Sequence, residues 1–356
     1  MAELMNSNDL NEGGFSEEQS DDGQLKSIVT VPDMNPNQQV NKNDEAAEKV
    51  YDLSKMSDIL LLVKEKDEEK IKKFVKEYIY KILIESGVTE KHVCIFLFDE
   101  DNSISRGHAE RIYDSIQSVS KEKDIILFLR SKGGRPEPAY LISKLCNRFK
   151  KDKFIVSIPA EAKSAATLLS FGADEIHMGP MSELGPIDMQ VDGLPLLSVS
   201  SALRKIASIV EEFPGSSGMF SDYLTQNLNI GLIGYYDRVT ESAIQYASIL
   251  LGDKHASDTS RSVDDIANRF TTHYKDHGFV IDAKESQDIL GEYIVKDNSK
   301  IYSLGSKILS LINQIEFAFI LSGVKKKIIL VGDGCDIGLC DASKDNALFK
   351  GLKISI

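Results

Sequence analysis

The feature that most constrains this chain is a series of four short apolar runs separated by stretches with helical periodicity. The runs are apolar on both faces, which is typical of strands in a sheet covered on both sides. Between them, apolar residues recur every three or four positions, as in amphipathic helices. Strand and helix alternating at this interval predict right-handed crossovers and a mainly parallel sheet, so the fold class is α/β. The runs are residues 93–98, 124–130, 153–158 and 175–178.

Helical patterns extend over much of the remaining chain. A first helix is predicted at 56–86, and beyond residue 196 the pattern is mostly helical, with a last strand pair formed by 327–331 and 352–356. No internal repeat is visible, which argues against a solenoid. The other predicted helices are 105–120, 138–150, 164–171, 196–213, 236–252, 259–275, 283–290 and 300–322.

Residues 1–54 differ in composition from the rest of the chain. They are rich in Asn, Asp, Glu, Ser and Gln, and residues 1–50 carry 11 acidic side chains against 3 basic ones. With so few aliphatic side chains the segment cannot offset the entropy lost on ordering. We therefore expect a disordered acidic tail before the folded part of the chain.

The overall charge is −13, from 42 Lys and Arg against 55 Asp and Glu in 356 residues. This charge disfavours a nucleic-acid partner held by phosphate neutralisation. The longest uninterrupted apolar runs have about five or six residues, against roughly 20 for a membrane-spanning helix. The first 25 residues also lack the pattern of a secretory signal. We expect no membrane span and a cytoplasmic location.

The four cysteines, Cys94, Cys146, Cys335 and Cys340, are too far apart for paired CxxC clusters and are expected to be reduced thiols. Cys335 and Cys340 could share a metal ion. However, no histidine lies nearby, and a closed zinc site needs four nitrogen or sulfur ligands. No metal or other cofactor is expected.

A pair of glycines, Gly133 and Gly134, lies directly after the second predicted strand, within Ser-Lys-Gly-Gly-Arg-Pro. Because glycine has no Cβ, backbone N–H groups there can approach a ligand closely, as stabilisation of an oxyanion requires. The alternative is a tight turn between strand and helix. A phosphate loop is disfavoured because the chain has neither a GxxxxGK motif followed by Ser or Thr nor GxGxxG.

Ser164 follows the third predicted strand and begins a run of small and apolar residues that should form a buried helix. A hydroxyl there could act as a nucleophile, because unpaired N–H groups at a helix start favour negative charge. The more ordinary role of serine at such a position is a helix N-cap.

Taken in order, these segments resemble the serine peptidases of the Clp and signal-peptide-peptidase-A class, and most closely the serine dehydrogenase proteinase family. The resemblance spans roughly residues 90–295. It implies a crotonase-like fold, a ClpP-type superhelix of β-β-α repeats at 55–295, with a helix and strand extension at 296–356. It also implies assembly into homotrimers or larger rings. The segments that carry it are 124–134 (DIILFLRSKGG), 158–167 (IPAEAKSAAT) and 173–190 (ADEIHMGPMSELGPIDMQ).

The resemblance also implies roles for single residues. Ser164 matches the nucleophile, and the N–H groups of Ala165 and of Gly133 or Gly134 match the oxyanion hole. Lys163 departs from the family, which commonly has a small or apolar residue there, and could alter the entrance to the site. A second departure is that Met189 precedes Gln190, where the family has proline. The residues that match the segment closing the substrate cleft are Gly185, Pro186 and Asp188.

The general base is not fixed by the sequence. A serine nucleophile needs a neutral histidine, or a lysine whose pKa burial has lowered. Lys205, in the helical stretch after the cleft segment, is the first lysine candidate, and His277 is the histidine candidate for an acid-base or orienting role. Solvated positions are the alternative for both. His177 is less favoured, because its strand would lead away from the site.

The leading interpretation is a serine-type peptidase that acts on a protein or peptide substrate through an acyl-enzyme. One alternative is an acyl-CoA enzyme of crotonase type, in which the paired amides would polarise a thioester. The other is a non-catalytic binding protein that kept the fold, with Ser164 as a helix cap and the acidic tail as a contact for a partner.

Overall fold

The computed structural model describes residues 50–117, 122–188, 190–191, 194–195, 197–227, 230–252 and 261–339. A compact unit begins at Val50, and Tyr51 and Leu53 are already buried in it. Most of the expected acidic tail lies outside the described residues, as does the predicted strand at 352–356. The boundaries expected at residues 54 and 295 stay predictions.

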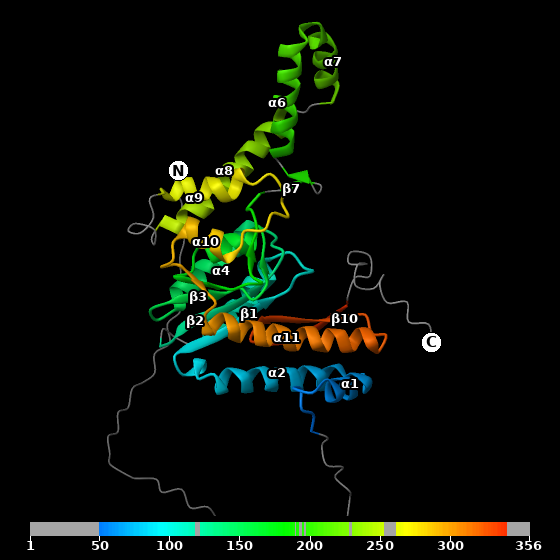
Figure 1. Cartoon of the computed structure of the whole chain (residues 1–356), viewed down its shortest axis with the longest axis vertical. Coiled ribbons are helices and arrows are strands. Elements are labelled where there is room, and N and C mark those ends of the chain that lie inside the picture. The colour runs from blue at the N-terminus through cyan, green and yellow to red at the C-terminus, as the bar shows by residue number, and fades with distance from the viewer. Residues whose placement is uncertain are drawn as a thin grey trace, which may run out of the picture. The chain divides into compact units, whose positions relative to one another are not determined.

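A seven-stranded sheet forms the centre of this unit, in the order β11-β10-β1-β2-β3-β5-β9. Figure 1 labels β1, β2, β3 and β10 of this sheet. The five strands from β1 to β9 are parallel, and β10 and β11 are antiparallel to their neighbours. The predicted α/β class with a mainly parallel sheet is therefore confirmed. The strands are β1 (His92–Phe98), β2 (Asp124–Arg130), β3 (Phe154–Ser157), β5 (Glu175–Met178), β9 (Val295–Asp297), β10 (Lys326–Gly332) and β11 (Gly334–Leu339).

Helices cover both faces of the sheet. Successive side chains along a strand point to opposite faces, so each central strand contributes to two hydrophobic cores. On β1, Ile95 and Leu97 belong to one core, while Phe96 and Phe98 belong to the other. The first face carries α3 (Arg106–Gln117), α4 (Pro136–Phe149), α5 (Ala165–Ser170), α8 (Ile230–Gly252), α9 (Val263–Asn268), the π-helix η3 (Arg269–His273) and α10 (Ala283–Leu290). The second face carries α1 (Met56–Lys64), α2 (Glu68–Glu85) and α11 (Lys300–Leu321).

The single helix predicted at 56–86 is wrong, because the chain forms two helices there. Lys66 has a φ of 57°, which ends α1. The Asp67 side chain then accepts the Lys70 N–H at 3.0 Å and caps the start of α2. An apolar stripe continues across this break, so periodicity alone does not reveal it.

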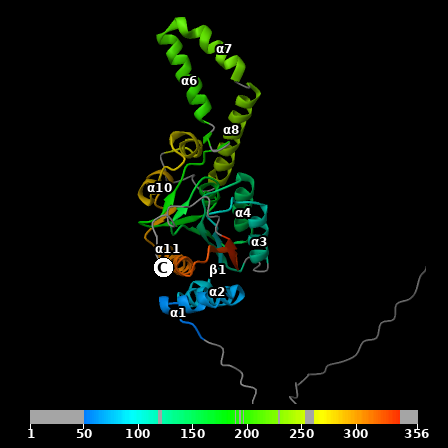
Figure 2. The same cartoon turned by 90° about the vertical axis from the view of Figure 1, so that its right-hand side faces the viewer.

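Two helices, α6 (Leu197–Glu212) and α7 (Ser217–Asn227), stand apart from the sheet together with the first part of α8 (Figures 1 and 2). A short hairpin of β7 (Gln190–Val191) and β8 (Leu194–Pro195) precedes them, and η2 (Pro214–Ser216) joins them. No side chain of α7 is buried. We call α6, η2 and α7 the helical arm.

Helix α11 is long and apolar enough to cross a membrane, by length and composition alone. Half of its most apolar window is buried within the protein. Its inward side chains, among them Ile308, Ile312 and Phe319, pack with α1, α2 and the sheet in the second core. In this structure α11 is thus a helix with one buried face.

Two phenylalanines on α11 test this packing. Phe319 is 1% exposed and Phe317 is 45% exposed. Phe319→Ala should lower the free energy of unfolding by about 3–5 kcal/mol, because it leaves a cavity in the core. Phe317→Ala should lower it by less than about 1 kcal/mol. Urea unfolding followed by circular dichroism measures both, and equal losses would contradict the orientation of α11.

Candidate active site

Ser164 lies between β4 (Glu161–Ala162) and α5, in a conformation that residues other than glycine rarely adopt. Its φ is 50° and its ψ is −118°, outside the extended region that an N-cap residue normally occupies. The side chain makes no capping hydrogen bond within the part of the chain that the structure describes. Strain of this kind is characteristic of functional turns, where the surrounding structure holds a residue in place. Ser164 therefore does not serve as a helix cap in this structure.

The glycine loop, residues 131–134, is hydrogen-bonded to the segment that carries Ser164. The Ser131 N–H donates to the Glu161 carbonyl at 3.1 Å, and the Lys163 N–H donates to the Ser131 carbonyl at 3.0 Å. A Cβ on Gly133, whose φ is 102°, would lie 2.8 Å from the Ser164 Cβ. Only glycine fits there, so the paired glycines and the serine lie side by side.

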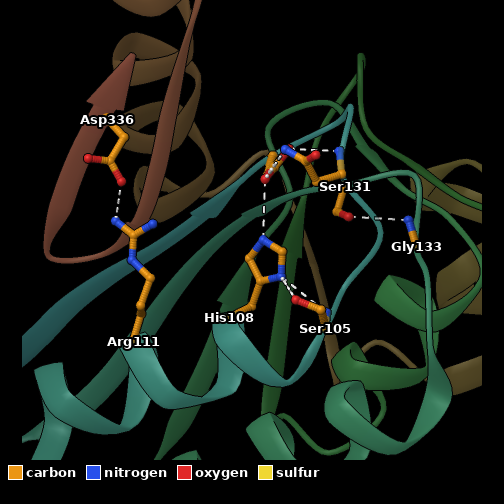
Figure 3. Close-up of polar contacts among 8 residues, drawn as sticks. Ser105, His108, Arg111, Ser131, Gly133 and Asp336 are labelled. Atoms are coloured by element: carbon orange, nitrogen blue, oxygen red, sulfur yellow. Dashed lines mark hydrogen bonds and ion pairs between the residues drawn. The ribbon is translucent and has the colours of Figure 1, made fainter. Parts of the chain in front are cut away.

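Two backbone N–H groups at this turn have no acceptor among the described residues. The Gly133 carbonyl accepts the Ile104 N–H at 2.9 Å, and because the peptide is trans, the Gly134 N–H points to the opposite side. Within the described residues, neither this N–H nor that of Ala165 has a hydrogen-bond partner. The Gly133 N–H, by contrast, donates to the Ser131 hydroxyl at 3.2 Å (Figure 3). The free donors are thus the Gly134 and Ala165 amides.

A buried carboxylate supports the segment that binds the glycine loop. Asp99 accepts the Asn102 N–H at 2.9 Å and lies 3.2 Å from His108 Nε2. Burial raises the pKa of Asp99, but the hydrogen bonds from His108 and Asn102 outweigh burial and lower the pKa below its usual value. His108 Nδ1 accepts the Ser105 N–H at 3.1 Å, so Nε2 carries the proton (Figure 3). This network orders the turn between β1 and α3.

Asp188 and His277 form a hydrogen-bonded pair although they are 89 residues apart. His277 Nδ1 faces a carboxylate oxygen of Asp188, which is buried, whereas the imidazole is one-third exposed. The Asp188 hydrogen bond, opposed by burial, raises the pKa of His277. An antiparallel bridge between Leu184 and Ile281 brings the two segments together. Among the described residues, His277 Nε2 has no partner and so is available to another group.

Lys163, directly before the candidate nucleophile, connects these two parts of the site. Its ammonium lies 3.1 Å from Glu183 Oε1 and 3.4 Å from the Phe279 carbonyl oxygen, two residues beyond His277. A Cβ on Gly185 would lie 2.4 Å from Lys163 Cδ, so this glycine makes room for the lysine. Lys163 is therefore a buried lysine whose ion-pair partner, Glu183, lies at the start of the cleft segment.

The structure brings together most of the residues that the sequence singled out, but not all of them. Pro186 is buried next to the glycine that accommodates the lysine. Lys205 is exposed on α6, whose main contacts are with β8 and η2. His177 lies 3.0 Å from Glu175 Oε2 and 2.6 Å from the Ser299 hydroxyl, where it links β5 to the start of α11. Neither residue has a described contact with the serine turn.

Sequence reasoning missed two relations within the site. It treated Asp188 as a cleft residue and His277 as a separate candidate, and nothing in the sequence pattern connects residues so far apart. It also left open whether Gly133 or Gly134 supplies the oxyanion-hole N–H. In the structure the Gly133 N–H already donates to the Ser131 hydroxyl. Both relations depend on long-range packing or on hydrogen bonding.

Within the described part of the chain, the Ser164 hydroxyl has no hydrogen-bond acceptor, so the contact with His277 that proton transfer needs is not made here. Catalytic hydrogen bonds are often formed only when substrate is bound. No group of three or more His, Cys, Asp or Glu side chains in the described residues could hold a metal ion. Cys340, considered with Cys335 as a metal ligand, lies outside those residues.

No protein-family model matches the chain. Two curated proteins of Methanocaldococcus jannaschii are similar to it. Uncharacterized protein MJ0137 is 30% identical over 97 residues, which are 27% of this chain and 34% of the relative. Uncharacterized protein MJ1495 is 24% identical over 196 residues, which are 55% of this chain and 61% of the relative. The chain thus spans less than two thirds of the length of either relative.

Two solved structures are also similar. A mutant of the 1510-N membrane-bound stomatin-specific protease, in complex with a substrate peptide, has 16% identity and a TM-score of 0.35 over 58% of this chain and 75% of that one. ClpP1 from Listeria monocytogenes has 14% identity and a TM-score of 0.37, and the match covers 62% of this chain and 99% of that one. Because both TM-scores are below 0.5, we draw no conclusion about this chain from them.

The Asp188–His277 pair generates a pH prediction. Asp188→Asn should lower the pKa of His277, which NMR titration of the imidazole measures, and Asp276→Asn should lower it less, because Asp276 contributes least of the groups that raise it. Because the pKa of His277 is higher in the folded than in the unfolded protein, its pairing with Asp188 stabilises the fold. This stabilisation is fully present at pH values below the unfolded pKa of about 6.5 and is lost as pH rises through the folded pKa. Asp188→Asn should therefore destabilise more at pH 5.5 than at pH 8.5, and the reverse order would contradict the pairing.

Proposed function

We propose that this chain is a serine hydrolase that cleaves peptide bonds through an acyl-enzyme on Ser164. The observation that carries the proposal is the strained, non-capping Ser164 beside the two free N–H groups of Gly134 and Ala165. A nucleophile next to paired amide donors is the arrangement that acyl transfer needs. The substrate class, a protein or peptide, is part of the proposal.

In the proposed reaction the Ser164 hydroxyl attacks the substrate carbonyl carbon while His277 Nε2 takes its proton. The Gly134 and Ala165 N–H groups donate to the oxyanion of the tetrahedral intermediate. The imidazolium then protonates the leaving amine, and water hydrolyses the ester by the same sequence of proton transfers. Asp188 holds the ring by Nδ1 throughout. Only the neutral imidazole can accept this proton, and the Asp188 hydrogen bond raises the pKa of His277, so the rate should increase as pH rises through that pKa.

We assign the base to His277 rather than to Lys205. His277 has a buried carboxylate partner and lies in the segment that contacts Lys163, next to the serine. A lysine base needs burial to lose its proton at neutral pH, and Lys205 is exposed on the helical arm. Lys205 stays the alternative.

One observation favours a second candidate function. The Ser164 hydroxyl makes no hydrogen bond to a base in this structure, which is what a non-catalytic binding protein with this fold would show. The acyl-CoA alternative has no comparable support, because a thioester site needs the two amides but not a strained serine. Stabilisation by coenzyme A thioesters in a thermal shift assay would restore it.

The finer classification is also a proposal. We infer a crotonase-like superhelix and a relation to the serine dehydrogenase proteinase family, supported by the order of the glycine loop, the Ser164 turn and the Leu-Gly-Pro-Ile-Asp segment along the chain. We further propose a cytoplasmic enzyme that works without nucleic acid, metal or cofactor.

Activity-based labelling tests the assignment. A fluorophosphonate probe should label the full chain, and Ser164→Ala should abolish labelling. His277→Ala should slow labelling by about 10²–10⁴-fold, the usual contribution of a general base, while Lys205→Ala should leave the rate unchanged. Labelling that survives Ser164→Ala, or that is lost in Lys205→Ala, would contradict the proposed roles. A folded protein that is never labelled would support the non-catalytic candidate instead.

The helical arm favours self-association, in line with the expected homotrimer or larger ring. Phe213, Met219 and Tyr223 are large apolar side chains that it leaves exposed, and contact with a second copy of the chain would remove their apolar surface from water. Met219→Lys combined with Tyr223→Lys should lower the oligomeric state measured by light scattering. Tyr293→Lys, an equally exposed position outside the arm, is the control. A wild-type monomer, or the same effect from the control, would contradict this role of the arm.

A further inference from the structure

A cavity lies at the opposite end of the strands from Ser164. It has a volume of about 630 Å³ and lies between α2, the start of β1 and the turn that joins β10 to β11. The Ser164 turn and the glycine loop follow the carboxyl ends of β3 and β2, whereas this cavity begins at His92, the amino end of β1. The parallel strands therefore separate it from the candidate active site.

The floor of the cavity is apolar. Leu83 of α2, Phe96 of β1 and Leu330 of β10 line it and are themselves buried in the second core. At its border, Tyr80 and Ile84 are more than half exposed although both are large apolar side chains. A cavity of this volume with such a lining falls in the range of sites for small organic ligands.

The charges at the two ends of the cavity differ. Toward the amino-terminal part of α2, Lys76 lies 3.9 Å from Asp333, so its charge is partly neutralised. Toward the other end lie His92 and Lys123, and none of the described residues that line the cavity there is acidic. The Lys123 ammonium donates to the Thr89 carbonyl at 2.6 Å and has two further N–H donors. The cavity therefore has an apolar floor, an ion pair at one end and the Lys123 cation at the other, in a chain whose net charge is −13.

From this arrangement we propose that the cavity is a binding site for a medium- or long-chain carboxylate. The carboxylate is held by Lys123 next to His92, and the aliphatic chain lies along the apolar floor toward Cys335. The ion pair gains strength from the low-dielectric surroundings, and the chain gains by leaving water. Neither the candidate nucleophile nor its base takes part.

Two thiols in the lining provide a direct readout. Cys94 and Cys335 are half-buried and line the cavity, and burial raises the pKa of each thiol to about 12. Both should react slowly with N-ethylmaleimide, and bound dodecanoate should slow them further. Cys146, buried outside the cavity, is the internal control that should not react. Peptide mass mapping of the full chain measures each site separately.

The binding test compares amphiphiles of equal length and opposite charge, below their micelle concentrations, by isothermal titration calorimetry. Dodecanoate should bind, decanoate about tenfold more weakly because two methylenes are lost, and dodecyltrimethylammonium more weakly than either. Lys123→Met should weaken dodecanoate about tenfold and leave dodecanol unchanged. Lys76→Met should have a smaller effect on dodecanoate, because Asp333 already neutralises part of the Lys76 charge in the wild type.

Four outcomes of the binding and protection experiments would overturn the proposal. They are no binding of dodecanoate, equal binding of the cationic amphiphile, no effect of Lys123→Met, and no protection of Cys94 or Cys335. Ile84→Glu, which places a carboxylate at the exposed border, should also weaken dodecanoate, whereas Phe317→Glu on the exposed face of α11 should not. Equal effects of these two variants would indicate unspecific adsorption and would contradict the site.

Discussion

The close backbone contact between the glycine loop and the Ser164 turn is the constraint on which the candidate site depends. Gly133 lies so close to the Ser164 segment that no side chain fits on it. A Cβ at this position would lie 2.6 Å from the Lys163 carbonyl oxygen. The two hydrogen bonds that join Ser131 to the β4 segment hold this contact. Because the loop cannot move away without breaking them, the free Gly134 amide stays beside the strained serine, and the cost of that strain is borne by the surrounding packing.

The sheet makes this contact possible. Strands β2 and β3 are parallel neighbours, so the loops that follow them meet at the same edge, where ligands of open α/β sheets usually bind. Both strands are buried on their two faces by helices, which fixes their ends relative to each other. The Asp99–His108 network adds support from β1, the next strand along, through the Ile104 bond to the Gly133 carbonyl.

The remaining part of the site comes from much later in the chain. The Ile187 N–H donates to the Phe270 carbonyl at 2.8 Å, which docks the cleft segment on the π-helix that leads to His277. Asp188 and His277 therefore meet by tertiary packing, and the buried Lys163 ties the same region to the serine turn. The two halves of the proposed catalytic set thus depend on different contacts, one with a neighbouring strand and one with a distant helix.

The sequence by itself determined the α/β class, four of the five parallel strands, the limits of most helices that it predicted and the order of a glycine loop and Ser164 along the chain. These follow from local periodicity and from residue types whose backbone freedom is local. The sequence did not predict strand β9 or helix α7. It did not determine the break at Lys66, the partner of His277 or which glycine amide is free. Only the tertiary structure decided these. The partner of His277 and the free amide depend on hydrogen bonds that no local sequence pattern predicts. The break depends on the φ angle of Lys66, which does not change the spacing of the apolar residues.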